Sequence, residues 1–503
     1  ILASATLIES LFFGSVSAQS NYPNRTIQTI MPLQAGSGVD ILMRPIAQKM
    51  SENLGQAITI ENIPGGAGII GATKVAQSPA DGFVLGAFND NVFKQGLILV
   101  LTFMAAAKLG MRVSLLNNLA AMLFVLPFFL FSALAGQIAD KYEKSWLTRL
   151  IKILEIVIMV VAAFGFVFEI YPLLFVALFL MGTHSTFFGP IKYAYLPQAM
   201  STDELVGANG LFQMGTSLAI LTGMMLAGVL MKLDSPLFWI SGVTVFVAIM
   251  GYLASRFIPI MTAPQPDLTI DWNIFRTSWQ TIANLYRLPI MWFTILGNSW
   301  FWFYGATFLT QVPEFSKSIL LGDESVVIFL LTLFSVGTAL GSLLCKTLTK
   351  NQVSLKLLPF GIAGLTIFAI DLYFTLSAMH LPPLANNAHY SIGMIFATQG
   401  AIRVFVDLFL LGFSGGIYIV PLYAYMQAYS PETSRARIIG ANNILNAVFM
   451  VGSAIFSIVC LTLVNVSLPM LFAIVGVINL VMGIWLFLKL KKYSPAKPIM
   501  THE

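Results

Sequence analysis

Charged residues are scarce in this chain: Asp, Glu, Lys and Arg make up 10% of its 503 residues, whereas soluble domains carry about 25%. The only two cysteines, Cys345 and Cys460, lie in apolar segments, so no disulfide is predicted. The four histidines lack metal-ligand spacing, no Gly-Lys pair is present to form a P-loop, and no histidine is followed five residues later by aspartate. The net charge of +5 forms no basic stripe. These absences argue against a metal site, another cofactor, an ATP-driven pump, an enzyme and a nucleic-acid partner.

Long apolar runs are what the sequence has instead. Hydrophobic residues make up 57% of the chain, and residues 83–490 form a nearly unbroken series of such runs. Each run is close to the ~20 residues that a helix needs to cross a bilayer core of ~30 Å. The sequence therefore predicts an all-α integral membrane protein. The predicted spans are 84–106, 113–139, 147–168, 171–191, 205–231, 236–259, 288–311, 325–348, 353–377, 403–428, 438–464 and 467–489.

The basic residues are distributed unequally between the two ends of these twelve spans. If the first span begins in the cytoplasm, seventeen Lys and Arg residues lie at cytoplasmic span ends or in the tail 491–503, and five lie at the opposite ends. The positive-inside rule then predicts that both ends of the membrane domain are cytoplasmic.

The first 82 residues have a different character. Residues 1–18 contain an apolar stretch that ends in Val16-Ser17-Ala18, which is typical of a secretory signal segment. Residues 19–82 alternate between strand-like segments and helical segments that begin with glycine turns, so they predict a β-α-β-α unit. The predicted strands are 27–33 and 57–62.

The segment 19–82 resembles the beginning of the periplasmic solute-binding proteins of the tripartite tricarboxylate transporter family. The resemblance rests on residues 22–25, 32–40, 61–68 and 78–82, and it implies a glycine turn that helps to bind a carboxylate. About 60 residues are too few to bury a domain core. The segment is therefore interpreted as a truncated α/β fragment that was joined to the membrane part by an accidental fusion, and the function is expected to lie after residue 82.

The membrane part contains an internal repeat. The polar stretch 260–287 follows the sixth span and separates the halves 83–259 and 288–490. Residues 190–209 (PIKYAYLPQAMSTDELVGAN) parallel residues 421–442 (PLYAYMQAYSPETSRARIIGAN). Two parallel six-helix repeats joined by a central linker are typical of the major facilitator superfamily, so we expect a twelve-helix fold of that type.

A loop motif supports this resemblance. Gly136, Asp140, Lys141 and Lys144 match the superfamily pattern between spans two and three, in which glycine permits close helix approach and the carboxylate can bind a neighbouring helix end and basic side chains. We interpret the motif as a gate that favours one conformer; the alternative is a solvated loop without that role. The equivalent segment Gly341–Lys346 in the second half has lost the acid.

Further motifs resemble the lysophospholipid transporter family, and in particular the transporter domain found fused to acyltransferase and acyl-carrier-protein synthetase modules. They are residues 85–94 (LGAFNDNVFK), 187–193, 196–198, 203–209, 299–303, 419–423 and 435–446. The resemblance implies import of lysophospholipid, chiefly lysophosphatidylethanolamine, from the outer to the inner leaflet of a bacterial inner membrane. It also implies reacylation by a separate acyltransferase or acyl-carrier-protein synthetase.

A lysophospholipid carrier needs a few charges in an apolar cavity, and charged groups inside spans are functional candidates because inserting them costs ~2.5–3.5 kcal/mol each. Asp90 and Lys94 are four residues apart on span one, hence on one helix face. We predict that Asp90 binds an ammonium group and that Lys94 or Lys192 binds the phosphate. The remaining candidates for substrate binding are Asn89, Asn91, Glu155, Asp371 and Asp407.

Other interpretations of these residues stay open. Lys94 and Asp90 can instead pair with each other, Lys192 can extend to the interface, and each of the three other acids can relay protons or pair with a neighbour. His184 and Asn442 are expected to have packing roles. The aromatic run Trp300–Tyr304 lines an acyl-chain groove or faces lipid.

Three alternative functions remain possible from the sequence. The first is a proton-coupled exporter of amphipathic small molecules, which would share the fold. The second is a membrane partner subunit of a phospholipid acyltransferase. The third is a solute-binding receptor built on residues 19–82.

Overall fold

The computed structural model describes residues 27–31, 47–48, 51, 57–62, 84–86, 113–230, 233–350, 352–379, 381–382 and 389–493. The chain divides into two compact units, Ile1–Phe88 and Asn89–Glu503.

The first unit contains a three-stranded parallel sheet with the order β2-β1-β3. Strands β1 (Ile27–Met31) and β2 (Ile58–Asn62) confirm the two strands predicted in this region. Strand β3 (Val84–Gly86) pairs with β1, although the sequence predicted that a membrane span begins at residue 84. A short apolar run fits a buried strand as well as a helix, and periodicity alone cannot separate the two. The rest of that predicted span lies outside the described residues.

The second unit is helical, and each span predicted from residue 113 onward coincides with a long helix. These helices are α6 (Val113–Lys141), α7 (Lys144–Val167), α8 (Tyr171–Ala199), α9 (Leu205–Leu230), α10 (Pro236–Ser255), α12 (Pro289–Ser318), α13 (Glu324–Leu348), α14 (Leu358–Ala378), α16 (Ala401–Tyr429), α17 (Arg435–Ile458) and α18 (Leu468–Tyr493). The helical turns η3 (Leu355–Leu357) and η5 (Glu432–Ser434) precede α14 and α17, and the π-helical turn η6 (Val459–Leu463) continues α17.

Two segments between the predicted spans contain helices. The linker 260–287 includes α11 (Ile274–Tyr286), whose first turn is capped by Asn273 through a hydrogen bond from the backbone N–H of Arg276 at 3.0 Å. The loop 378–402 includes the short helix α15 (Ile392–Phe396). Polar composition indicated a linker but hid the helical periodicity inside it.

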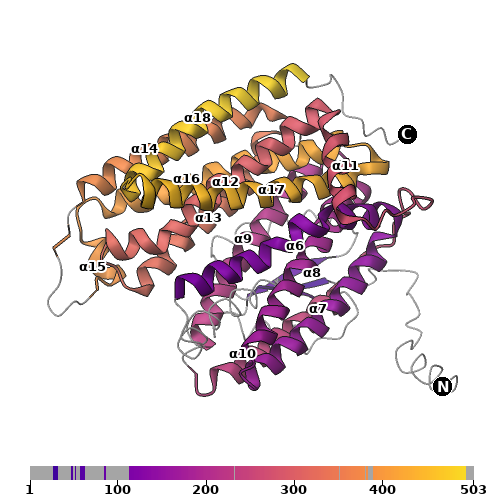
Figure 1. Cartoon of the computed structure of the whole chain (residues 1–503), viewed down its shortest axis with the longest axis horizontal. Coiled ribbons are helices and arrows are strands. Elements are labelled where there is room, and N and C mark those ends of the chain that lie inside the picture. Colours follow the sequence, from indigo (N-terminus) through magenta and orange to yellow (C-terminus); the bar gives the residue numbers. More distant parts are fainter. Residues whose placement is uncertain are drawn as a thin grey trace. The chain divides into compact units, whose positions relative to one another are not determined.

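The internal repeat is visible in the helix packing. In the first half α6 packs on α8 and α7 packs on α10, and in the second half α13 packs on α16 and α14 packs on α18 as the equivalent pairs. The halves meet through two further equivalent pairs, α6 with α17 and α9 with α13. Figure 1 shows the helices of the first half from indigo to magenta and those of the second half from salmon to yellow. The predicted architecture of two related helical halves is thus confirmed.

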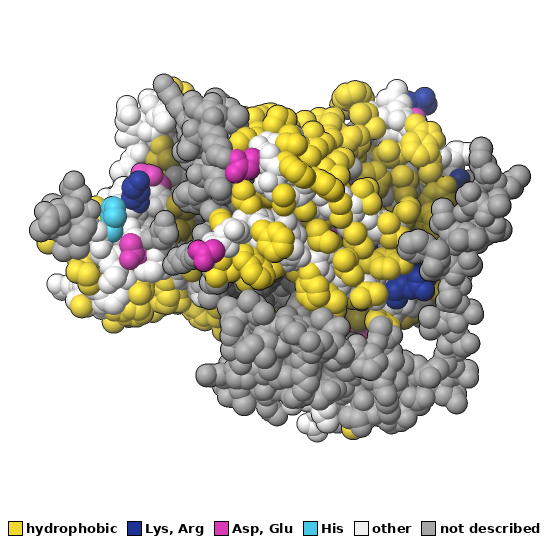
Figure 2. Space-filling model, turned by 90° about the horizontal axis from the view of Figure 1, so that it is seen from below, with side chains coloured by type: hydrophobic (Ala, Val, Ile, Leu, Met, Phe, Trp, Pro, Cys, Tyr) yellow, Lys and Arg dark blue, Asp and Glu magenta, His cyan; other side chains and the backbone are white. Residues whose placement is uncertain are grey.

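The outer surface of the bundle is apolar. On α14, Phe360, Ile367 and Phe374 recur every seven residues and are 69%, 57% and 59% exposed. Figure 2 shows a face that is largely covered by hydrophobic side chains. In the part of the chain that the structure describes, nine helices have the length and composition to cross a membrane. Apolar surface of this extent requires lipid around it.

Close contact between α13 and α16 depends on glycine. A Cβ atom on Gly412 would lie 2.1 Å from the backbone oxygen of Phe334. Because a backbone oxygen cannot move aside as a flexible side chain can, the two helices would have to separate. In contrast, a Cβ atom on Gly452 of α17 would meet nothing within 4 Å.

We expect Gly412→Ala to lower the midpoint of thermal unfolding in detergent. Overpacking costs about 1–3 kcal/mol, which exceeds the ~1 kcal/mol that alanine contributes to helix propensity. The matched variant Gly452→Ala should leave the midpoint unchanged or raise it. An equal midpoint for the two variants would contradict the close α13–α16 contact.

Candidate functional site

The Gly136–Lys144 motif lies where the two halves meet. Asp140, 1% exposed, sits near the end of α6 and faces the first turn of α17. Its carboxylate accepts hydrogen bonds from the backbone N–H groups of Ala436 (2.9 Å) and Arg437 (3.2 Å), and the Arg437 Nε atom lies 3.0 Å from it. A helix N-terminus carries unpaired N–H groups and a partial positive charge, so it suits a carboxylate. The contact that the motif predicted between this acid and a neighbouring helix end is therefore present.

We call the contact of Gly136 and Asp140 with Ala436 and Arg437 the latch. Gly136 makes it possible, because a Cβ atom at this position would lie 2.7 Å from the Cα atom of Arg437. The two lysines of the motif do not bind Asp140 directly. Lys141 Nζ donates to the backbone oxygen of Leu268 at 2.8 Å, and Lys144 acts on Asp140 only through its charge.

The linker also binds to the latch. The backbone N–H of Gln265 donates to the backbone oxygen of Asp140 at 3.0 Å, and its side-chain oxygen accepts a bond from Arg437 Nη2 at 2.8 Å. On either side of this contact, Met261 N–H donates to Glu143 Oε1 (3.2 Å) and Asp271 N–H donates to Gln137 Oε1 (2.9 Å). We call this end of the bundle, where the linker crosses the end of α6 and the start of α17, the linker end.

Glu143 joins the start of α7 to the linker. Its carboxylate accepts bonds from the backbone N–H groups of Ser145 and Trp146, both at 2.7 Å, in addition to that of Met261. Burial alone would raise the pKa of Glu143, but these bonds together hold its pKa below the usual value. Glu143 is therefore ionised at neutral pH.

Two buried cations lie next to the latch. Lys144 and Arg435 are 2% and 5% exposed and influence one another electrostatically. Among the described residues, neither Lys144 Nζ nor Arg435 Nε has a hydrogen-bond acceptor. Arg435 Nη2 donates to the backbone oxygen of Ser430 at 3.3 Å. Among the described residues at the linker end, several positive charges therefore surround one buried carboxylate, that of Asp140.

The halves also meet where α9 packs against α13. A hydrogen-bonded contact between two uncharged side chains lies next to this second junction. Asn209 of α9 and Gln427 of α16 form two reciprocal amide bonds, at 2.5 Å and 3.2 Å. Both side chains are buried, at 3% and 0% exposed. At the same junction Gly207 lies against the side chain of Lys346.

Two tyrosines from the repeat segments also meet between the halves. Tyr193 of α8 and Tyr423 of α16 stack with ring centroids 4.7 Å apart. Lys192, predicted to bind phosphate, is half-buried beside them, with its ammonium 5.2 Å from the Tyr193 ring centroid and 4.7 Å from that of Phe212. The structure therefore brings one of the predicted substrate-binding residues to the interface between the halves.

A polar cluster in the second half surrounds Tyr423. The side chains of Tyr193, Trp302, Asn442 and Asn446 all lie close enough to its hydroxyl to interact with it. Asn442, expected to have a packing role, is fully buried and accepts a bond from Asn298 Nδ2 at 3.1 Å. The aromatic run Trp300–Tyr304 lies next to this cluster. Three of its side chains are too buried to face lipid: Trp300, Phe301 and Tyr304 are 5%, 8% and 1% exposed.

The first half contains a buried ionic triad. Glu155 of α7 is 0% exposed, and its Oε2 atom lies 2.8 Å from Lys152 Nζ and 3.0 Å from His184 Nε2 of α8. Lys152 Nζ also lies 4.9 Å from the ring centroid of Phe188. The predicted candidate Glu155 thus has a lysine and a histidine as partners within its own half.

The acids of the second half form a separate group. Asp371 of α14 forms a bidentate ion pair with Arg403 of α16. Asp407, one turn further along α16 and 2% exposed, lies close enough to Asp371 for the two carboxyl groups to influence one another electrostatically. The predicted candidates Asp371 and Asp407 are therefore neighbours and do not lie together with Glu155.

The span-one candidates Asn89, Asp90, Asn91 and Lys94 lie outside the described residues. Arg437, Gln427 and the tyrosine pair were not selected from the sequence as site residues. The signal for Gln427 and Tyr423 was present, because both lie in the repeat segment 421–442. Nothing local in the sequence marked Arg437 as the partner of Asp140.

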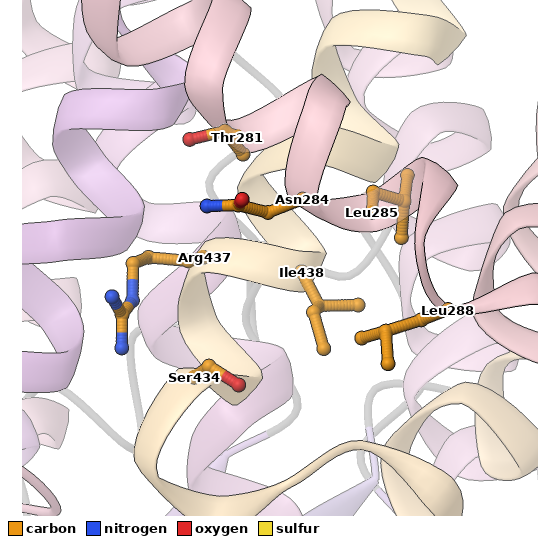
Figure 3. Close-up of a pocket in the computed structure, with 7 residues that line it drawn as sticks. All are labelled: Thr281, Asn284, Leu285, Leu288, Ser434, Arg437 and Ile438. Atoms are coloured by element: carbon orange, nitrogen blue, oxygen red, sulfur yellow. The ribbon is translucent and has the colours of Figure 1, made fainter.

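A pocket at the linker end, drawn in Figure 3, separates α11 from the start of α17. Its volume is about 90 Å³, whereas ligand pockets for small molecules usually measure about 300–1,000 Å³. The pocket is therefore too small for an acyl chain. It is lined by Thr281, Asn284, Leu285, Leu288, Ser434, Arg437 and Ile438.

We expect Glu155→Leu to reduce strongly the yield of folded protein, because it leaves the buried Lys152 without its carboxylate, a loss that costs about 3–5 kcal/mol for a buried pair. The double variant Lys152→Met with Glu155→Leu should recover most of the loss, since apolar replacement of a whole pair is often neutral. Fluorescence-detected size-exclusion chromatography and thermal unfolding measure both variants. Parent-like stability of the single variant would show that the pair is not buried as described.

Comparison with known proteins agrees with this geometry. Residues 83–448 match the family described as the Major Facilitator Superfamily. The lysophospholipid transporter LplT of Cronobacter sakazakii is 26% identical over 412 residues, which cover 77% of this chain and 93% of that protein. LplT of an Enterobacter species is 26% identical over 361 residues, which cover 71% of this chain and 80% of that protein.

Solved structures resemble the chain in fold alone. The transporter FucP in the outward conformation has a TM-score of 0.58 at 12% identity and covers 80% of this chain and 97% of its own. A bacterial homologue of the iron transporter ferroportin, in an outward-facing state, has a TM-score of 0.56 at 14% identity and covers 80% and 96%. Because the family match spans most of the chain and the helices pack as two related halves, this chain belongs to the major facilitator superfamily.

Proposed function

We propose that this protein moves lysophospholipid, chiefly lysophosphatidylethanolamine, across a bacterial inner membrane by alternating access. The observation that carries the proposal is the similarity to transporters named for lysophospholipid, over 93% of the length of one of them. The proposed orientation places the linker end and both ends of the membrane domain in the cytoplasm, in keeping with the charge asymmetry of the sequence.

The chemistry of the substrate fits the distribution of charges. A lysophosphatidylethanolamine has an anionic phosphate, a cationic amine and one acyl chain. We propose that Asp90 binds the amine and that Lys94 or Lys192 binds the phosphate, with Asn89 and Asn91 as further donors. Support for Lys192 comes from its position beside the Tyr193–Tyr423 stack, between the two halves.

The other charged candidates take a different part in the proposal. Glu155 is paired with Lys152 and His184, and Asp371 is paired with Arg403. We infer that these acids act on packing or proton movement within one half rather than as direct ligands. The imported lipid would be reacylated by a separate acyltransferase or acyl-carrier-protein synthetase.

The latch is proposed as the gate on the cytoplasmic side. Asp140 joins the end of α6 in one half to the start of α17 in the other. Opening at the linker end would require these bonds to break. A substrate cavity that opens alternately to each side follows from rocking of the two halves.

The transport proposal predicts movement of fluorescent lysophosphatidylethanolamine between leaflets of vesicles that contain the full chain. Asp90→Ala should abolish this movement, because it removes the proposed partner of the amine. A diacyl phosphatidylethanolamine serves as a control lipid, and the rate is compared with and without a proton gradient. A folded parent protein that does not move lysophosphatidylethanolamine would contradict the lysophospholipid proposal. If that protein instead exports amphipathic dyes when a proton gradient is present, the result would support the proton-coupled exporter.

The gate proposal predicts that Asp140→Asn loosens the linker end. Hydrogen bonds to a charged group contribute about 1.5–3 kcal/mol, so their loss shifts the balance between conformers by about tenfold or more. In a protein with Cys345 and Cys460 replaced by alanine, we expect a cysteine at the buried position Ser430 to react at least about tenfold faster with a water-soluble maleimide.

The matched control for this experiment is Glu204→Gln. Glu204 accepts bonds from Ser201 on the exposed loop before α9 and lies outside the latch. Its replacement should leave the labelling rate at Ser430→Cys unchanged. Equal rates with Asp140→Asn and without it would exclude the latch as a gate.

A further inference from the structure

The linker helix α11 has three distinct faces. At about 100° per residue, Phe275, Trp279 and Tyr286 fall on one face. Thr277 and Leu285, each 2% exposed, fall on the face that packs against the bundle. Between these two faces, on the third, lie Arg276, Gln280 and Arg287.

The aromatic face is not covered by any described residue to a significant degree. Phe275, Trp279 and Tyr286 are 70%, 77% and 68% exposed, and Trp272 just before the helix is 69% exposed. Side chains of this size seldom gather on a face that meets only water. Something apolar therefore has to lie against this face.

The position of α11 indicates a membrane surface. Its last residue, Tyr286, packs on Trp292 near the start of α12 with ring centroids 5.4 Å apart. Phe293 in turn stacks on Tyr493 at the end of α18, at 5.7 Å. Figure 1 shows α11 at the same end of the bundle as the end of α18. The helix thus lies at the level where membrane-spanning helices end, which is the depth that Trp and Tyr prefer.

The charge of this region favours anionic lipid. Residues 274–287 contain two arginines and no acidic residue, although Arg276 lies 3.5 Å from Asp271 of the preceding segment. The last turn of α18 adds exposed Lys491 and Lys492. Basic residues beside an aromatic face are typical of helices that lie in the plane of an anionic membrane surface.

We propose that α11 lies in the headgroup region of the membrane at the linker end, with Phe275, Trp279 and Tyr286 in lipid and Arg276 and Arg287 on anionic headgroups. The occupant of the aromatic face is the lipid leaflet itself, and neither a protein partner nor a second copy of this chain.

This placement connects the lipid surface to the latch. The linker segment just before α11 binds Gln137, Asp140 and Glu143 through Asp271, Gln265 and Met261, respectively. If α11 binds the membrane, it holds in place the end of this linker segment that continues into α11. Anionic lipid that binds α11 more tightly in the latched state stabilises the latch, and the coupling is reciprocal.

The test uses the full chain with both native cysteines replaced by alanine. It is reconstituted in two kinds of phosphatidylethanolamine vesicle, one with about one third anionic phosphatidylglycerol and one without it. A nitroxide label is attached at Trp279→Cys or at the matched position Gln280→Cys. Both positions are exposed in the structure and differ only in the face they occupy. Collision rates with oxygen, which partitions into lipid, and with a water-soluble nickel complex report the surroundings of each label.

We expect the label at position 279 to collide mainly with oxygen and the label at position 280 mainly with nickel. The double substitution Arg276→Gln with Arg287→Gln should remove any effect of phosphatidylglycerol on the depth at position 279. Equal nickel collision at the two positions would overturn the proposal by placing the aromatic face in water. A label at position 279 that meets neither agent would overturn it by showing that protein covers the face. Each labelled variant is first checked for a thermal unfolding midpoint equal to that of the cysteine-free parent.

Discussion

The structure at the linker end depends on one buried carboxylate. Asp140 is 1% exposed and meets the first turn of α17, which belongs to the other half of the protein. Burial of an ion costs several kcal/mol, and charge-assisted bonds from two backbone N–H groups and Arg437 offset that cost. The net stabilisation is a small difference between large terms. A difference of a few kcal/mol is the size needed for two conformers that both have to be populated during a transport cycle.

The two junctions between the halves are equivalent in packing but not in chemistry. The α6–α17 junction contains the charged latch, whereas the equivalent α9–α13 junction lies beside the neutral Asn209–Gln427 pair. The sequence explains the difference, because the second copy of the loop motif, Gly341–Lys346, has no acid. The α9–α13 junction therefore lacks the acid that forms the charged contact of the latch, although Lys346 lies at this junction.

The sequence predicted those features that repeat or that have a clear period. Long apolar runs gave the spans from residue 113 onward, and the parallel segments 190–209 and 421–442 gave the two halves. The motif also predicted that Asp140 would bind a helix end. Strand β3 was missed because three apolar residues carry no period, and α11 was missed because its polar composition was given more weight than the spacing of its aromatic residues.

Partners distant in sequence could not be predicted for the site. Arg437 lies 297 residues from Asp140, and no local pattern distinguishes it from other basic residues at helix starts. The ion pair of Asp371 with Arg403 and the triad of Glu155 with Lys152 and His184 depend on how neighbouring helices rotate against each other. Hydrophobic periodicity reports which face of a helix is buried, but it does not report which polar group it meets.

The distribution of ion pairs has a consequence for movement. The buried triad lies entirely within the first half, and the Asp371–Arg403 pair lies entirely within the second. When the halves rock against each other, the charges of these described pairs keep their partners, so the movement does not have to separate them. Among the described ion pairs only that of Asp140 with Arg437 joins the halves, and it lies at the linker end, where water can reach the groups as they separate. Rigid-body movement of the halves is therefore compatible with charges inside an apolar bundle.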